Sequence, residues 1–259
     1  LHRRLAAAQQ AEASARLAVI RRQQAAINAI TTDRTQAIAA AARILPGQER
    51  CGDLYTVQAL DEHRLLAAAA DAGAMGTAGI IQATAMLNAL STAAALAGPR
   101  TELGQILTAM NRSTAGRADR QPIPLVAVWI DLVAGRISYV NAGHAAPLLL
   151  AGPARLVTLE QTALLPGADP ETIYKSASAD LPARFRLILV SDGLIEAPDK
   201  AGQAFGQERL HEALLSEAAF GQPGQIIELL ASALAGHLQD TPQLDDAMII
   251  ALAKDSKSS

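Results

Sequence analysis

The sequence predicts an α+β fold in which antiparallel β-strands pack with helices. Residues 54–60 and 64–70 are two apolar runs joined only by Asp61-Glu62-His63, a pattern typical of a β-hairpin. Four more short runs between residues 125 and 159 are separated by turns that contain glycine, and they indicate an antiparallel meander. Apolar residues at three- and four-residue steps predict helices between and after these strands. Hydrophobic residues make up 50% of the 259 positions, which is enough for a large core.

The composition excludes several classes of protein. A net charge of −3 and an aromatic content of 3% provide neither the basic surface nor the stacking platforms of a nucleic-acid-binding protein. Cys51 is the only cysteine, so a disulfide or a cysteine-based zinc site within one chain is excluded, and we expect a cytoplasmic protein. No secretory signal opens the sequence and its first residue is Leu1, so we expect a piece of a longer protein, with any membrane attachment only through upstream segments.

The N-terminal stretch predicts one long helix. Residues 1–30 contain no glycine or proline and carry a thin, alanine-rich apolar stripe. Such a stripe fits a linker, one half of a two-stranded coiled coil, or a strut lying on the domain. We therefore interpret residues 1–32 as a linker or regulatory helix through which the protein can form a homodimer.

The next elements bring two aspartates together. Residues 36–45 are a possible first strand, although their alanines fit a helix as well, and Pro46-Gly47 then turns the chain. Asp53 stands directly before the first hairpin strand and Asp71 directly after the second. Because the start of one antiparallel strand lies beside the end of the next, Asp53 and Asp71 should emerge at the same edge.

Between the hairpin and the meander we expect two helices and a loop. Residues 78–98 are rich in alanine, isoleucine and leucine, but polar residues such as Gln82 and Asn88 favour a buried helix over a membrane span. A second helix is expected over 101–112 and a polar surface loop over 111–124. The meander strands should cover 125–132, 136–141, 147–150 and 156–159, followed by a loop over 160–181 with one short strand near Ile173.

The last third of the chain contains a strand that should be buried on both faces. Residues 185–190 form an apolar run interrupted only by Arg186, and the run stops at Ser191-Asp192-Gly193. Asp192 is either a carboxylate presented in a cleft or the cap of the next helical turn. Helices over 206–216 and 224–237 then lead to a final strand over 247–252, with Asp245-Asp246 at its mouth.

Four aspartates, Asp53, Asp71, Asp192 and Asp245, therefore stand where predicted strands begin or end. Converging carboxylates raise one another's pKa, and divalent cations would relieve that repulsion. Ligation by oxygen alone suits Mg²⁺ or Mn²⁺, and two such ions about 3.5–4 Å apart can activate a water for attack on a phosphoryl group. The pattern indicates hydrolysis of a phosphate ester without a covalent enzyme intermediate.

Six motifs in the same order resemble the SpoIIE/RsbU branch of the metal-dependent type 2C (PPM) serine/threonine protein phosphatases, over about residues 36–252. Each motif alone is weak, whereas six in the correct order are specific. The matching segments are C-G-D-L-Y (51–55), D-A-G-A-M-G-T-A (71–78), I-D-L-V-A-G-R-I-S-Y-V-N-A-G-H (130–144), S-D-G-L-I-E-A (191–197), F-G-Q-E-R-L (205–210) and D-D-A-M-I-I (245–250).

The resemblance implies a fold and a set of roles. The fold is four-layer αββα, with two packed antiparallel sheets flanked by helices, over residues 33–254, and residues 255–259 are then a disordered tail. Two Mn²⁺ or Mg²⁺ ions would be bound by Asp53, Asp71, the backbone carbonyl of Ala72, Asp192 and Asp245. The water that bridges the ions would attack a phosphoserine or phosphothreonine on a partner protein. In the relatives that partner is an anti-sigma-factor antagonist, as in bacterial stress signalling.

Three departures from the family pattern leave other functions open. Thr56 replaces an acid that often follows the first aspartate by three residues, which puts an auxiliary metal in doubt, and Cys51 and Ala74 replace glycines. One rival is a pseudophosphatase that docks the partner without turnover. Another is a sensor output module that is inactive until the N-terminal helix is repositioned.

Other polar residues near these motifs have simpler interpretations. We interpret His144 and Asn141 as hydrogen-bonded structural residues of the A-G-H turn. Glu196 is expected to support the Asp192 loop, Asp131 to serve a turn, and Trp129 to belong to the core. Asp246 is the alternative to Asp245, which the motif register favours.

Overall fold

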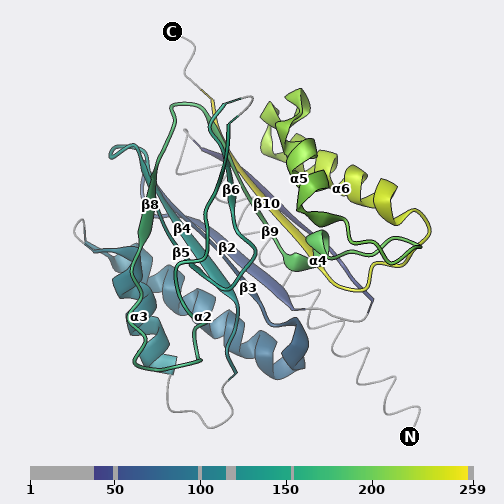
Figure 1. Ribbon diagram of the computed structural model, residues 1–259. Helices are drawn as coiled ribbons and strands as arrows, with labels where there is room; N and C mark the ends of the chain where they lie inside the picture. Colours follow the sequence, from purple (N-terminus) through teal and green to yellow (C-terminus); the bar gives the residue numbers. More distant parts are fainter. Residues whose placement is uncertain (1–37, 49–51, 99–100, 115–120, 153–154, 256–259) are drawn as a thin grey trace, which may run out of the picture.

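The computed structural model describes residues 38–48, 52–98, 101–114, 121–152 and 155–255, and it consists of two antiparallel sheets packed face to face with helices on both outer sides (Figure 1). The predicted four-layer αββα arrangement is confirmed. The helix and dimer contact expected over residues 1–30 lie outside the described residues.

Each sheet has five strands. The first sheet has the order β1-β10-β9-β6-β7, with β1 (Ala39–Leu45), β6 (Leu148–Leu150), β7 (Leu156–Thr158), β9 (Phe185–Val190) and β10 (Ala247–Lys254). The second has the order β2-β3-β4-β5-β8, with β2 (Asp53–Ala59), β3 (Arg64–Asp71), β4 (Leu125–Asp131), β5 (Arg136–Ala142) and β8 (Ala177–Asp180). The ambiguous segment 36–45 is thus a strand, and the hairpin of β2 and β3 is confirmed.

Helices cover the outer faces (Figure 1). One group lies on the second sheet: the 3₁₀ turn η1 (Gly73–Met75), α2 (Gly76–Leu96) and α3 (Leu103–Thr114). The other lies on the first sheet: α4 (Asp192–Ile195), α5 (Gly206–Leu215), η2 (Glu217–Phe220) and α6 (Pro223–Leu238).

Helix α2 belongs to the core of the domain. Of the helices in the described ranges it alone is long and apolar enough to cross a membrane, a test that core helices of soluble proteins also pass. Its side chains at Ala83, Met86 and Leu90 are buried and pack with Leu66 and Ala68 of β3. One face of α2 is therefore buried against the second sheet, as predicted, whereas Ile81 and Leu96 are exposed on its other side.

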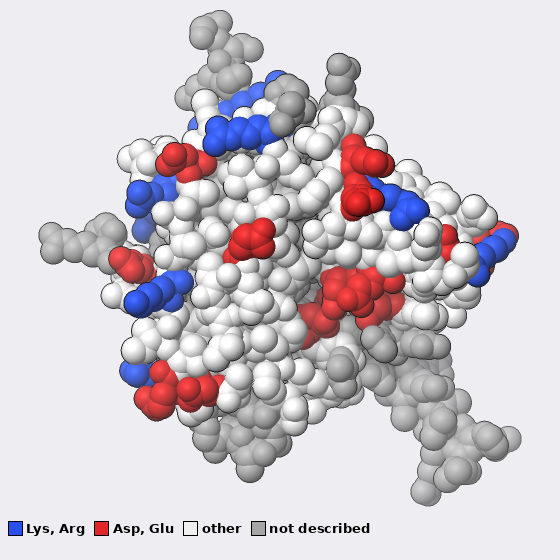
Figure 2. All heavy atoms as spheres, in the orientation of Figure 1, with Lys and Arg blue, Asp and Glu red and all other residues white. Residues whose placement is uncertain are grey.

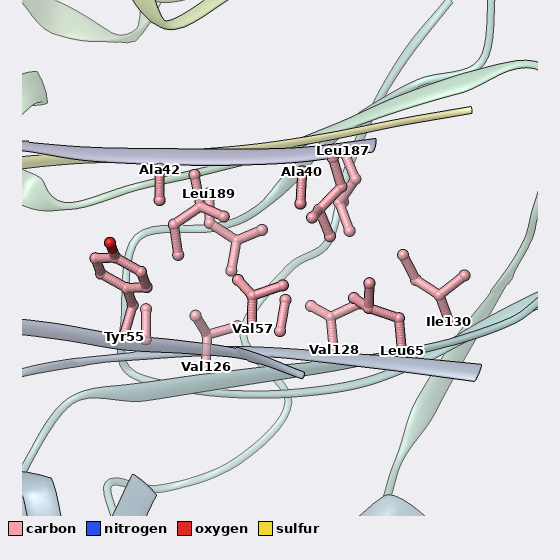
Figure 3. Packing of buried hydrophobic residues seen from close by; sticks show 14 of the residues in the cluster. Ala40, Ala42, Tyr55, Val57, Leu65, Val126, Val128, Ile130, Leu187 and Leu189 are labelled. Atoms are coloured by element: carbon pink, nitrogen blue, oxygen red, sulfur yellow. The ribbon is translucent and has the colours of Figure 1, made fainter. Parts of the chain in front are cut away.

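The space between the sheets is filled by side chains that alternate along the strands. Tyr55, Val57 and Val128 of the second sheet face Leu187 and Leu189 of the first (Figure 3). Residues one position along, such as Leu54 and Leu66, point instead to the outer face beneath α2 and α3. The parity of a residue along its strand therefore decides whether it faces the other sheet or a helix.

Arg186 is the one charged residue in β9, and it is fully buried. Its guanidinium donates to the carbonyls of Phe220 (2.7 Å) and Gly221 (2.8 Å) and to the Asp255 carboxylate (2.6 Å). All six residues of β9 are buried, as predicted, because these acceptors satisfy the arginine.

Three details of the predicted organisation are wrong. The meander is divided, because β4 and β5 stay in the second sheet whereas β6 and β7 join the first. The short strand is β8 (Ala177–Asp180), and Ile173 lies before it in an exposed coil. Asn111 is a buried residue of α3, whose side chain donates to the Asp169 carbonyl (2.8 Å) and accepts from the Gly167 amide (2.9 Å), so the helix extends through the start of the predicted loop.

Candidate metal centre

Asp53 and Asp71 lie directly opposite each other at one edge of the second sheet. They are register partners in the ladder of β2 and β3, as the sequence predicts. Side chains opposite each other on one face of a sheet are about 5 Å apart, so two carboxylates here repel each other. Asp71 Oδ1 accepts a hydrogen bond from the Gly73 amide (2.7 Å), which holds that side chain in the turn.

Asp192 and Asp245 come from the first sheet. Asp192 follows β9, Asp245 precedes β10, and these strands are neighbours, tied together beyond the ladder by the Ser191 amide donating to the Met248 carbonyl (3.1 Å). The charges of Asp71, Asp192 and Asp245 all act on Asp53. The structure therefore brings the four predicted aspartates together from both sheets. Figure 2 shows acidic side chains gathered where α4 lies in Figure 1.

Asp53 is the buried member of the group. Its side chain is 6% exposed, and its Oδ2 atom is buried without a hydrogen-bond partner. Burial raises the pKa of Asp53 well above its usual value, the neighbouring aspartates raise it further, and the Ser191 hydroxyl lowers it. Among the described residues, no ion pair reaches Asp53, Asp71 or Asp192.

Asp192 lies at the open side of the group. It is exposed at the start of α4, yet desolvation of its carboxyl raises its pKa from 3.8 to about 6, with further contributions from Asp71, Glu196 and Asp245. Glu196 thus acts on the site through its charge. The alternative that Asp192 only caps the next helical turn does not fit the structure, because Ser191 is the N-cap of α4 and no side-chain cap bond forms there.

These residues fit divalent cations that are partly hydrated. Within the described ranges, no three Asp, Glu, His or Cys side chains are arranged to hold one ion by themselves. Mg²⁺ usually keeps several waters and binds one or two carboxylates, so four aspartates whose charges act on one another suit it. The orphaned, buried Oδ2 of Asp53 is an oxygen donor that such an ion would satisfy. The Ala72 carbonyl accepts from the Met75 amide (3.0 Å) and retains a second lone pair for an ion.

Glycines allow the backbones around the aspartates to approach closely. A Cβ on Gly193 would lie 2.0 Å from the Asp246 carbonyl oxygen, and one on Gly52 would lie 2.4 Å from the Ala72 carbonyl carbon. Neither position has room for a side chain. The backbone can therefore pass this closely only with glycine at positions 52 and 193, directly beside Asp53 and Asp192.

Asp245 and Asp246 have different surroundings. Asp246 is buried, and its Oδ1 accepts a hydrogen bond from the Gly47 amide (2.9 Å), which ties the start of β10 to the turn after β1. Asp245 is partly exposed, and its charge acts on both Asp53 and Asp192. The geometry thus favours Asp245 for the site and gives Asp246 a structural role.

Thr56 faces away from this site. Side chains alternate along β2, so Thr56 points to the same outer face as Leu54. Its hydroxyl forms a hydrogen bond with the Ser91 hydroxyl of α2 (3.2 Å). A side chain at this position points to α2 and not to the space between the sheets. An acid here would not join the Asp53 group, so its loss leaves that group intact.

The turn after β5 lies at the same edge of the sheet. Asn141 Oδ1 accepts from the His144 amide (3.1 Å), which is the predicted structural role, and His144 Nδ1 contacts the Ala145 carbonyl (3.2 Å). His144 Nε2, however, is buried without a partner. Burial lowers the pKa of His144, while the Ala145 carbonyl and the charge of Asp71 raise it.

Two other predictions near the motifs are confirmed. Asp131 accepts hydrogen bonds from the Val133 and Ala134 amides of its turn, and Trp129 is buried.

Ser191 is the site residue that the sequence reasoning missed. It is completely buried, its hydroxyl accepts from the Met248 amide (2.9 Å) and donates to the Asp246 carbonyl (3.2 Å), and its proximity from the other sheet lowers the pKa of Asp53. Its position directly before Asp192, at the end of a buried strand, is the sequence feature that could have identified it.

The chain matches known proteins over most of its length. Residues 61–255 match the family model described as Stage II sporulation protein E (SpoIIE). Protein IcfG of Synechocystis sp. is 30% identical over 123 residues, which cover 48% of this chain and 19% of IcfG, so the chain spans about a fifth of that relative.

Solved structures share the fold at low sequence identity. The SiaA-PP2C domain of Pseudomonas aeruginosa has a TM-score of 0.74 at 19% identity and covers 98% of both chains. The RsbU and RsbW domains of Rv1364c from Mycobacterium tuberculosis give a TM-score of 0.70 at 22% identity, over 87% of this chain and 64% of that one. With the family match over three quarters of its residues, this chain belongs to the SpoIIE family and has the type 2C phosphatase fold of the SpoIIE/RsbU branch.

Proposed function

We propose that the protein is a metal-dependent serine/threonine protein phosphatase. The single observation that carries this proposal is the buried Asp53 carboxylate, which has an unpartnered oxygen and lies beside three more aspartates from both sheets. Such a concentration of charge disfavours the ion-free state and favours two divalent cations, Mn²⁺ or Mg²⁺. Family membership and the shared fold support the reaction class.

The chain's own residues would have distinct tasks. Asp53 and Asp71, with the Ala72 carbonyl, would hold ions on the side of the second sheet, and Asp192 and Asp245 on the side of the first. The ions, when bound, supply a water of lowered pKa and a clamp for the phosphoryl oxygens. Ser191 would favour the ionised form of Asp53, because its hydroxyl lowers the pKa of that carboxyl. The exposed position of Asp192 leaves the open side of the group accessible to a phosphorylated chain.

We further propose that the substrate is a phosphoserine or phosphothreonine on a regulatory partner protein, with an anti-sigma-factor antagonist as the first candidate. The support is the similarity to Rv1364c, in which an RsbU domain and an RsbW domain occur together. A cytoplasmic location and a homodimer through residues 1–32 remain proposals that rest on the sequence.

Hydrolysis of p-nitrophenyl phosphate tests the proposed activity. We expect turnover that requires Mn²⁺ or Mg²⁺, is abolished by EDTA, and falls by at least about 100-fold in Asp53→Asn and Asp192→Asn, because each removes a ligand charge. Asp180→Asn, on the exposed edge strand β8, is the matched control and should retain the wild-type rate. A well-folded protein that binds Mn²⁺ without turnover would instead support the pseudophosphatase.

A further inference from the structure

His144 has an unsatisfied nitrogen that its structural role does not explain. The side chain is 8% exposed, and its Nε2 atom is buried without a hydrogen-bond partner. The Ala145 carbonyl can only accept, so the 3.2 Å contact requires that Nδ1 carries the proton. In the neutral ring Nε2 is then a bare acceptor, and a buried acceptor without a donor destabilises the fold.

The strand register places His144 at the edge occupied by Asp71. The Asp71 amide donates to the Pro124 carbonyl (3.1 Å), and the next residue, Leu125, bridges Gly143. Asp71, Pro124 and Gly143 thus lie close together where β3 and β5 end and β4 begins, and neighbouring strands are about 4.8 Å apart. His144 follows Gly143 directly. The negative charge of Asp71 acts on its imidazole, which agrees with this placement.

We propose that His144 is a positioning residue of the metal centre, in which the Nε2 lone pair accepts a hydrogen bond from a hydration water of the ion beside Asp71. This inference rests on the proposed function, because it needs an ion at that aspartate. It explains why a buried nitrogen is left without a protein donor: a partly hydrated Mg²⁺ brings water O–H groups to that position. It also assigns the two ring nitrogens separate tasks, with Nδ1–H holding the turn and Nε2 serving the centre.

Two substitutions separate the tasks of the two nitrogens. His144→Gln offers a carbonyl oxygen near the place of Nε2, whereas His144→Asn offers an amide N–H near the place of Nδ1. Isothermal titration of Mg²⁺ into the full chain measures the effect on binding without relying on activity. We expect His144→Gln to bind Mg²⁺ within about threefold of wild type and His144→Asn to bind about 10–100-fold more weakly, the usual range for residues that support metal ligands.

The opposite ranking would overturn the inference. If His144 serves only the turn, His144→Asn should bind Mg²⁺ like the wild type, because it keeps the bond to the Ala145 carbonyl, and equal affinities in all three proteins would contradict us as well. A wild-type protein that binds no Mg²⁺ would refute the proposed function and this inference together, whereas binding by the wild type without the expected ranking refutes this inference alone.

A second measurement does not depend on the variants folding. The ¹⁵N spectrum of the wild-type imidazole should show His144 Nε2 as an unprotonated nitrogen, and its resonance should move upfield when Mg²⁺ is added, as for a lone pair that accepts a hydrogen bond. A proton on Nε2, or an unchanged resonance at saturating Mg²⁺, would contradict the proposal.

Discussion

Replacing Asp192 by Asn should stabilise the metal-free protein at neutral pH. The folded state raises the pKa of this carboxyl from 3.8 to about 6. At about 1.36 kcal/mol per pH unit, keeping it ionised at pH 7 costs the fold up to roughly 3 kcal/mol. Because Asp192 is exposed, solvent screens much of this repulsion, and we reduce the expected gain to about 1 kcal/mol. The amide keeps the shape of the side chain and removes its charge.

The pH dependence gives this prediction its sign. A carboxyl with a raised pKa binds its proton more tightly in the folded state than in the unfolded state, so the fold loses stability as the pH rises from about 4 through 6 and above. The difference between variant and wild type should be full at pH 7.5 and reduced to about a third of that at pH 4.5, where the folded wild-type carboxyl is protonated and the unfolded one is mostly ionised. Saturating Mg²⁺ should reverse the order of the two proteins at pH 7.5, because only the wild type binds it tightly.

Thermal unfolding in EDTA measures this effect. A gain of about 1 kcal/mol corresponds to roughly 2–4 °C in the melting temperature for a domain of this size. Asp180→Asn is the control, since an exposed acid on edge strand β8 should change stability by less than about 0.5 kcal/mol at either pH. An Asp192→Asn protein that melts at or below the wild-type temperature at pH 7.5 without metal would refute the reasoning that the four carboxylates repel one another.

Three further predictions concern the supports of the site. Ser191→Ala should weaken Mg²⁺ binding by about 10-fold in a calorimetric titration, because the buried aspartate loses the hydroxyl that favours its ionised form; unchanged affinity would contradict this. Gly193→Ala should cost more than about 2 kcal/mol in urea unfolding, since its Cβ would lie 2.0 Å from a carbonyl, whereas Gly236→Ala in helix α6 meets nothing within 4 Å and should be neutral or stabilising. Asp245→Asn should reduce metal affinity with little loss of stability, and Asp246→Ala should lower the melting temperature by removing the acceptor of a backbone amide; the reverse pattern would exchange their roles.

Much of the fold follows from local patterns in the sequence. The hairpin of β2 and β3 is predictable because a polar turn separates two short apolar runs, and antiparallel geometry then pairs Asp53 with Asp71. The membership of β6 and β7 in the first sheet is not predictable in this way, because a strand carries the same alternation in either sheet. Strand β8 was predicted near Ile173, before its true position, because its residues are small or polar and only partly buried, and it is defined by pairing with β5.

The candidate site, like the fold, could be predicted from the sequence only in part. Acids at strand ends make Asp53, Asp71, Asp192 and Asp245 candidates, antiparallel pairing makes Asp53 and Asp71 neighbours, and the family resemblance implies that all four meet. Ser191 acts on Asp53 from the other sheet, and no sequence spacing encodes the distance between packed sheets.

Two other features of the site differ in how far the sequence could predict them. The orientation of Thr56 toward α2 follows from strand parity once β2 is known to begin at Asp53. The unpartnered nitrogen of His144 depends on burial in the folded domain, so only the structure reveals it.

A crystal of the protein soaked in Mn²⁺ tests the central claim most directly. The account predicts two anomalous peaks about 3.5–4 Å apart, bounded by Asp53, Asp71, Asp192 and Asp245 and by the Ala72 carbonyl. Crystals without a peak among these residues at saturating Mn²⁺, or with Mn²⁺ bound elsewhere, would contradict the claim that the four aspartates form a metal centre.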